Sequence, residues 1–351
     1  MSRQRFALLL VGALVVISAA IYSSVQRNRP HETQGALLWP TLAAELNAVT
    51  AVSVRKGSPT PTLTVHKTGD VWTVAERADY PADVAKLRKL LLALRDAKII
   101  EDKTSDPARY SAIGVEDPTQ AGSAAVEVIV TAPSATHALI VGKPVGEGNF
   151  VRRAGEKQSY SVEPAISLET EPRFWIDSRF IDTATALIQS IEVKPAGAPA
   201  YTLHRLNAAD NSFSLDGGPA GRKPLDAHAL APSATLLTGL TAEDVSPVGA
   251  IDFGRSSQAI VTLSDGNVLT LTGAVIADKH WLQVQASKDA ALTAKAQGRA
   301  FEVASYRYDA IFKPLDQLLV PKETPAPKAA PAAAAHAPKK PQPLASAPAA
   351  P

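Results

Sequence analysis

The region from Thr41 to Val320 reads twice through one pattern of alternating apolar and polar residues, and this repeat restricts the fold more than any other feature. Its first half begins with alternating segments at 49–54 and 63–67, and its second half begins with matching segments at 188–193 and 201–205. Further segments then match in the same order: 71–74 with 212–215, 126–130 with 260–263, 138–142 with 268–273, 149–152 with 280–283, and 160–162 with 301–303. Period-two alternation between turn residues is typical of antiparallel hairpins. The sequence therefore predicts an internal duplication with an antiparallel sheet in each half.

One segment of the first half has a helical spacing instead. Behind Tyr80-Pro81-Ala82-Asp83, apolar residues recur every three or four positions from Val84 to Leu94, and Asp83 suits the N-cap position. The basic residues of this segment lie mostly outside the apolar stripe: Lys86, Arg88, Lys89 and Arg95. The second half repeats this pattern more weakly, with Leu230, Leu236, Leu237 and Leu240. We therefore expect an α+β fold of two tandem lobes, residues 41–182 and 183–320, each an antiparallel sheet with one main helix.

An uncharged apolar segment, Phe6 to Tyr22, follows the basic head Met1 to Arg5. A basic head is retained in the cytoplasm while the chain behind the apolar segment is exported. We therefore predict a cytoplasmic head at 1–5, a transmembrane anchor at 6–24 and a linker at 25–40. This places the protein in the bacterial inner membrane, with a single span and a periplasmic main domain. Cleavage near Ser18-Ala19-Ala20 is the alternative, because the segment is short for a membrane span.

The charges and the C-terminal composition exclude some classes of function. Residues 321–351 are almost wholly Pro, Ala and Lys, which predicts a disordered tail that either is passive or contacts anionic wall polymer or lipid. Basic residues gather at both ends, so the body between them is mildly acidic and unsuited to nucleic acid. The chain has no cysteine, which excludes disulfides, thiolate metal sites and a cysteine nucleophile.

The first half also carries an ordered set of short motifs: Leu38-Trp39-Pro40-Thr41-Leu42, Trp72-Thr73-Val74, Tyr80-Pro81-Ala82-Asp83, Asp106-Pro107-Ala108-Arg109-Tyr110, Ile113-Gly114-Val115-Glu116-Asp117-Pro118, Leu139-Ile140-Val141-Gly142, Phe150-Val151-Arg152-Arg153 and Phe174-Trp175-Ile176-Asp177. Through these motifs the chain resembles, over residues 37–320, the family called domain of unknown function 4340. Its members are exported, membrane-anchored bacterial proteins, often encoded beside gliding-motility-type ABC transport systems. The resemblance implies an accessory role in the cell envelope, with protein partners in a transport complex, and it supplies no catalytic residues.

The seven histidines do not form a short metal-binding motif, because none lies three to five residues from another. His66 and His204 occupy the same position in the two halves. Alternation places Val65 and Leu203 inward and both histidines outward. We interpret them as solvated strand residues, and the alternative is a shared metal site that would require the two to converge.

Four further patterns are weak candidates for chemistry. Gly217 to Lys223 lacks the spacing of a phosphate loop and is interpreted as a turn, and Gly142 to Gly148 is interpreted as a flexible hairpin loop with a binding role as the alternative. Asp106, Asp117 and Glu171 each precede a proline, which is typical of turns rather than of paired catalytic carboxylates. Arg152-Arg153 is interpreted as a solvated strand edge, with recognition of an anion as the alternative.

No pattern in the chain identifies catalytic, cofactor-binding or metal-binding residues, and we expect no enzyme activity and no cofactor. The favoured hypothesis is a non-enzymatic accessory or scaffold protein of the bacterial cell envelope, associated with an ABC-type transport complex. A second hypothesis is a periplasmic module that binds a ligand or a wall polymer in the cleft between the lobes. A third is a hydrolase without a recognisable motif, which a buried carboxylate or histidine pair would favour.

Overall fold

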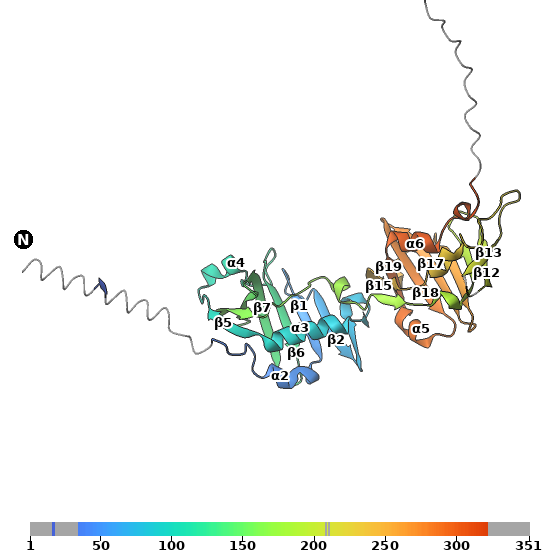
Figure 1. Cartoon of the computed structure of the whole chain (residues 1–351). Coiled ribbons are helices and arrows are strands. Elements are labelled where there is room, and N and C mark those ends of the chain that lie inside the picture. The colour runs from blue at the N-terminus through green and yellow to red at the C-terminus, as the bar shows by residue number, and fades with distance from the viewer. Residues whose placement is uncertain (1–15, 18–33, 208, 210, 322–351) are drawn as a thin grey trace, which may run out of the picture.

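The computed structural model describes residues 16–17, 34–207, 209 and 211–321 (Figure 1). The predicted head, almost all of the predicted anchor, most of the linker and the tail beyond residue 321 therefore lie outside the described residues. Within the described part, no helix is both long and apolar enough to cross a membrane. The described structure therefore does not bear out the predicted transmembrane helix or the inner-membrane location inferred from it.

The first lobe is built on one antiparallel sheet of nine strands, in the order β4-β3-β2-β1-β6-β7-β8-β9-β5. The strands are β1 (Ala51–Arg55), β2 (Leu63–Thr68), β3 (Val71–Val74), β4 (Tyr80–Pro81), β5 (Lys98–Asp102), β6 (Val126–Thr131), β7 (Thr136–Val145), β8 (Gly148–Arg153) and β9 (Ser159–Glu163). The helical elements are α2 (Leu42–Glu45), α3 (Val84–Asp96) and α4 (Tyr110–Ile113), with 3-10 turns η1 (Leu46–Ala48), η2 (Ala75–Arg77), η3 (Pro107–Arg109) and η4 (Pro172–Trp175).

The second lobe is built on an antiparallel sheet of eight strands, in the order β13-β12-β11-β16-β17-β18-β19-β15. The strands are β11 (Ile188–Lys194), β12 (Tyr201–Asn207), β13 (Ser212–Asp216), β15 (Asp244–Pro247), β16 (Ser257–Leu263), β17 (Val268–Ile276), β18 (Lys279–Ala286) and β19 (Arg299–Val303). The helical elements are α5 (Ala290–Ala296) and α6 (Ser305–Ile311), with 3-10 turns η5 (Thr185–Leu187), η6 (Ala231–Thr235), η7 (Val248–Ala250) and η8 (Leu315–Leu318).

The two sheets have the same order of corresponding strands. The eight strands from β3 to β5 in the first sheet correspond one by one to the eight strands from β13 to β15 in the second. The first sheet has one further strand, β4, at one edge. The expectation of an α+β fold was nevertheless wrong, because the regular secondary structure of the described residues is mostly antiparallel sheet. Among them α3 is the one helix longer than seven residues. Residues 230–240 contain no α-helix and, as helical structure, only the short turn η6, which lies between Leu230 and Leu236, since Pro232 and a gap of six positions before Leu236 leave no continuous apolar stripe.

Helix α3 covers one face of the first sheet, as its apolar stripe requires. Leu87, Leu90, Leu91 and Leu94 are buried, and the Asp83 carboxylate accepts a hydrogen bond of 3.0 Å from the backbone N–H of Lys86 at the N-cap. On strand β7, Leu139 belongs to this main core, while the next residue, Ile140, packs in a separate small cluster with Tyr110. Successive strand residues point to opposite faces, so α4 and its loop cover the face opposite α3.

The segment from Trp175 to Thr183 connects the lobes and pairs with both of them. In the first lobe, the N–H of Asp83 donates to the carbonyl of Trp175 at 2.7 Å, and in the second, the N–H of Ala242 donates to the carbonyl of Ser178 at 2.8 Å. Strand β10 (Arg179–Ile181) within this segment pairs with β14 (Leu240–Thr241). The lobes therefore lie end to end with β15 and β19 at the boundary, joined by backbone hydrogen bonds rather than by a free linker (Figure 1).

Aromatic side chains and ion pairs fill this boundary, which we call the lobe joint. Phe301 of β19 stacks on Phe180 with ring centroids 4.3 Å apart and meets Tyr80 edge-on at 5.7 Å. All three side chains are buried, and the main core continues through them from one lobe to the other. Arg77 pairs with Asp244 across the joint, and the Arg299 guanidinium donates to the carbonyls of Ala78 and Asp79 at 3.0 and 3.1 Å.

Candidate functional site

The structure does not bring His66 and His204 together, because one lies on β2 in the first sheet and the other on β12 in the second. The His66 Nε2 atom lies 3.4 Å from the Asp79 carboxylate, and that of His204 lies 3.3 Å from the Asp216 carboxylate. The exposed fraction of the side chain is 32% for His66 and 51% for His204. In the described part of the chain, no group of three or more His, Cys, Asp or Glu residues could hold a metal ion.

We expect His66→Ala and His204→Ala each to change the free energy of unfolding by less than about 0.5 kcal/mol, because exposed ion pairs contribute little. Denaturant unfolding of the two variants and the parent chain measures this directly. A loss of more than about 1.5 kcal/mol, or the disappearance of a metal bound by the parent, would contradict the interpretation as solvated strand residues.

The glycine-rich segments have structural roles in the turns and the sheet. In the turn from Gly217 to Lys223, Gly217 and Gly221 adopt positive φ, and the Arg222 guanidinium pairs with Asp316. The segment from Gly142 to Gly148 belongs mainly to β7 and β8, with only Gly146 and Glu147 between the two strands. A side chain at Gly142 would meet the carbonyl oxygen of Ile113 at 2.4 Å, so this glycine allows the α4 segment to approach the sheet.

Two of the acidic residues that precede proline act in turns, as predicted. The Asp106 carboxylate accepts from the N–H of Ala108 at 3.1 Å, and that of Asp117 accepts from the N–H and the hydroxyl of Thr119 at 2.9 and 2.8 Å. The hydrogen bond from the Thr119 N–H is the main cause that lowers the pKa of Asp117. The third, Glu171, pairs with Arg173 at 2.8 Å on the surface.

Arg152 and Arg153 are not a solvated edge, because both guanidinium groups are partly buried and hydrogen-bonded to the backbone. Arg152 lies 4.5 Å from the centroid of the Tyr110 ring and donates to the Val115 carbonyl at 2.9 Å. Arg153 donates to the Leu38 carbonyl at 2.7 Å. The two arginines therefore hold chain segments against the sheet, and these contacts occupy donors that a bound anion would need.

The structure also contains a histidine and carboxylate pair that sequence reasoning missed. The Nε2 atom of His137 on β7 lies 2.7 Å from the carboxylate of Glu45 on α2, with only 12% and 16% of the side chains exposed. The His137 ring lies 5.0 Å from that of the buried Trp39. Because these contacts enclose the pair, we interpret it as the attachment of α2 to the sheet. The large separation along the sequence explains why no local pattern could have indicated it.

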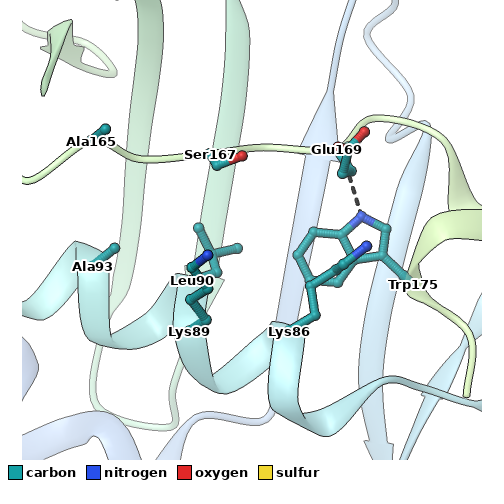
Figure 2. Close-up of a pocket in the computed structure, with 8 residues that line it drawn as sticks. All are labelled: Lys86, Lys89, Leu90, Ala93, Ala165, Ser167, Glu169 and Trp175. Carbon is teal, nitrogen blue, oxygen red and sulfur yellow. Dashed lines mark hydrogen bonds between the residues drawn. The ribbon is translucent and has the colours of Figure 1, made fainter.

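The surface around α3 has a different character, because a hollow lies on each side of the helix. One hollow, which we call the slot, has a volume of about 130 Å³ and lies between α3 and the extended segment 165–169 (Figure 2). Trp175 forms part of its wall, and its indole N–H donates to the Glu169 carbonyl at 2.9 Å. The Lys86 ammonium donates to the Phe174 carbonyl and lies 5.8 Å from the Trp175 ring, so this lysine supports the wall.

The other hollow, which we call the groove, has a volume of about 520 Å³ and lies between α3 and the α2–η1 segment. It is lined by Ala43, Leu46, Asn47, Val49, Lys67, Trp72, Val84, Leu87, Arg88, Leu91, Leu92 and Arg95. Val84 is 46% exposed and Leu92 is 36% exposed, which is unusual for aliphatic side chains on a core helix. Exposed apolar groups gathered around a hollow are typical of a binding surface.

Helix α3 also carries more positive than negative charge. It contains Lys86, Arg88, Lys89 and Arg95, whereas its one acidic residue, Asp96, is hydrogen-bonded to Arg95 at 2.7 Å. Arg88 and Lys89 are exposed and form no ion pair within the described residues. The arrangement can bind a partner with apolar and anionic groups. The sequence indicated the basic outer face of the helix, but not the two hollows, because their opposite walls come from distant segments.

The comparison with protein families identifies the chain. The family model described as "Domain of unknown function (DUF4340)" matches residues 72–258, which is more than half of the sequence. The protein therefore belongs to this family, and the resemblance seen in the motifs is confirmed. The matched region contains α3, the slot and part of the lobe joint, including Tyr80 and Phe180, whereas Phe301 of β19 lies beyond it. No match was found among curated proteins or among solved structures.

Proposed function

We propose that the protein is a non-enzymatic accessory or scaffold protein that binds a protein partner through the surface around α3. The observation that carries the proposal is the combination, on one helix, of exposed aliphatic side chains beside a groove and two cations, Arg88 and Lys89, that form no ion pair within the described residues. Protein interfaces combine an apolar centre with a polar rim in this way. Association with an ABC-type transport complex is the part of the proposal that rests on the family resemblance alone.

The lobe joint supports a scaffold role. The connecting segment is hydrogen-bonded to both lobes, and buried aromatic rings form one core across the boundary. We expect a chain joined in this way to behave as a single body and to present its surfaces at a fixed spacing. The buried rings of Tyr80, Phe180 and Phe301 occupy the position between the lobes. They therefore count against the alternative hypothesis of a ligand in a cleft there.

The proposal is tested by site-specific cross-linking, for which the chain is well suited because it contains no cysteine. A cysteine in place of Arg88 is labelled with a photoreactive maleimide in the full chain and irradiated with an extract of the cells that produce the protein. We expect a discrete cross-linked partner from this position, with subunits of a transport complex among the products.

The matched control is Arg109→Cys on η3, whose parent side chain is 77% exposed and which belongs to the segment on the opposite face of the sheet. This position should give no discrete product. If position 88 gives none either, or if both positions give the same products, the α3 surface is not the binding surface and the proposal fails.

A further inference from the structure

We propose that the groove beside α3 receives an acidic amphipathic helix of a partner protein. This inference rests on the proposed function and names the chemistry of its partner. Three observations carry it: the length and apolar floor of the groove, the charges on its rim, and the unsuitability of the other candidate occupants.

The groove has the length and the apolar lining that a helix requires. The α3 residues that line it recur from Val84 through Leu87 and Leu91 to Arg95, which is about three turns or about 16 Å along the helix axis. Trp72 of β3 and Leu46 of η1 form the opposite wall, and both are half-buried. A partner helix that lies in such a groove presents apolar side chains at i, i+3 or i+4, and i+7.

The charges on the rim select an anionic occupant. Lys67, Arg88 and Arg95 line the groove, and no carboxylate does. Arg95 already pairs with Asp96, and Lys67 lies 3.9 Å from the fully exposed Asp70. Arg88 is therefore the cation with the most to gain from an acidic partner. Complementary charges of this kind give specificity and register to an interface.

Other occupants fit the groove less well. A second copy that docked through the same surface would bring the cations of α3 against each other, which is unfavourable. The chain's own ends are also basic, with Arg3, Arg5, Arg27 and Arg29 before the body and Lys322, Lys328, Lys339 and Lys340 behind it. A layer of anionic lipid headgroups would match the charge, but a flat layer does not fill a recessed floor as a helix does.

The test is a selection that does not assume the occupant. A displayed library of random 16-residue peptides is selected on the full chain, and the selected peptides are then measured against charge variants by fluorescence anisotropy. We expect peptides with apolar residues at helical spacing and an excess of Glu and Asp. Their Kd should rise about tenfold with Arg88→Glu, because a rim contact becomes a repulsion.

The matched control is Lys89→Glu, which makes the same charge change on the next residue of α3 but on the side of the slot. It should change the Kd less than about twofold. Leu92→Glu, at a site where 36% of the parent side chain is exposed, should abolish binding without unfolding the chain. Equal effects of Arg88→Glu and Lys89→Glu, or selected peptides without acidic character, would overturn the proposal.

The alternative of a lipid ligand is tested by measuring binding to vesicles that contain anionic phosphatidylglycerol. If the chain binds these vesicles through Arg88 and Leu92 while the library yields no helical peptide, the groove is a lipid site and the proposal is wrong. The two failures can be told apart. If cross-linking from position 88 succeeds but the selected peptides lack acidic helices, only the proposal that an acidic helix occupies the groove is refuted. If cross-linking from position 88 fails, the proposed function itself is refuted.

Discussion

Replacement of Gly148 by alanine should lower the free energy of unfolding by more than about 3 kcal/mol or prevent the first lobe from folding. A Cβ atom at this position would lie 1.6 Å from the carbonyl oxygen of Val162 on the neighbouring strand β9. This obstacle is backbone rather than a mobile side chain, so it can move only if β8 and β9 separate. Both strands lie inside the sheet, with β7 on one side and the edge strand β5 on the other. Urea unfolding followed by circular dichroism measures the loss.

Gly249→Ala is the matched control for this experiment. A Cβ at Gly249 would have no atom within 4 Å, and its φ is not positive. The substitution should therefore be neutral or stabilise the chain slightly, because alanine restricts the unfolded state. An unchanged urea midpoint for Gly148→Ala would show that β8 and β9 do not approach each other as closely as the structure indicates.

The alternation of apolar and polar residues predicted the strands well, because side chains on a strand point to opposite faces in turn. Val52 and Val54 on β1 and Val65 on β2 are buried, as the alternation requires. The short edge strands β5 and β15 were missed. Segments of four or five residues that directly follow a helix or a turn carry too little alternation to be recognised.

The fold class was predicted wrongly because the strong helical pattern of the first half was assumed to form a helix in the second half as well, where the pattern is weak. The stripe from Val84 to Leu94 is continuous and folds as α3, whereas Pro232 interrupts the leucines from 230 to 240, and the residues between Leu230 and Leu236 form only a 3-10 turn. Helices α5 and α6 lie instead in segments that the repeat did not mark. With one long helix among seventeen strands of the two large sheets, the described chain is a β protein.

The candidate site could be predicted only in part. The sequence located the basic residues of α3 outside its apolar stripe, which is why Arg88 and Lys89 are exposed. The groove and the slot depend on packing against η1 and against the segment around Trp175. Such contacts arise from the tertiary fold, and no periodicity within α3 encodes them. The pair of His137 and Glu45 was missed for the same reason.

The second large effect is expected at the lobe joint, where Phe301→Ala should lower the free energy of unfolding by about 3–5 kcal/mol. The Phe301 side chain is completely buried, and its ring lies parallel to that of Phe180 within 1°. Its removal would leave a cavity between two lobes that share one core, so both lobes should lose stability. Phe174→Ala is the control of equal size, because the parent side chain is 43% exposed, and its effect should stay below about 1 kcal/mol.

Tyr80→Phe separates the role of the ring at the joint from that of its hydroxyl group. The Tyr80 hydroxyl is buried and has no hydrogen-bond partner among the described residues. Burial, together with the nearby Asp177 carboxylate, raises the pKa of Tyr80, so the hydroxyl stays neutral at every working pH. Loss of an unsatisfied hydroxyl costs little, so Tyr80→Phe should match the parent in urea unfolding.

If Phe301→Ala is as stable as Phe174→Ala, the rings do not couple the lobes, and the argument for a rigid scaffold loses its main support.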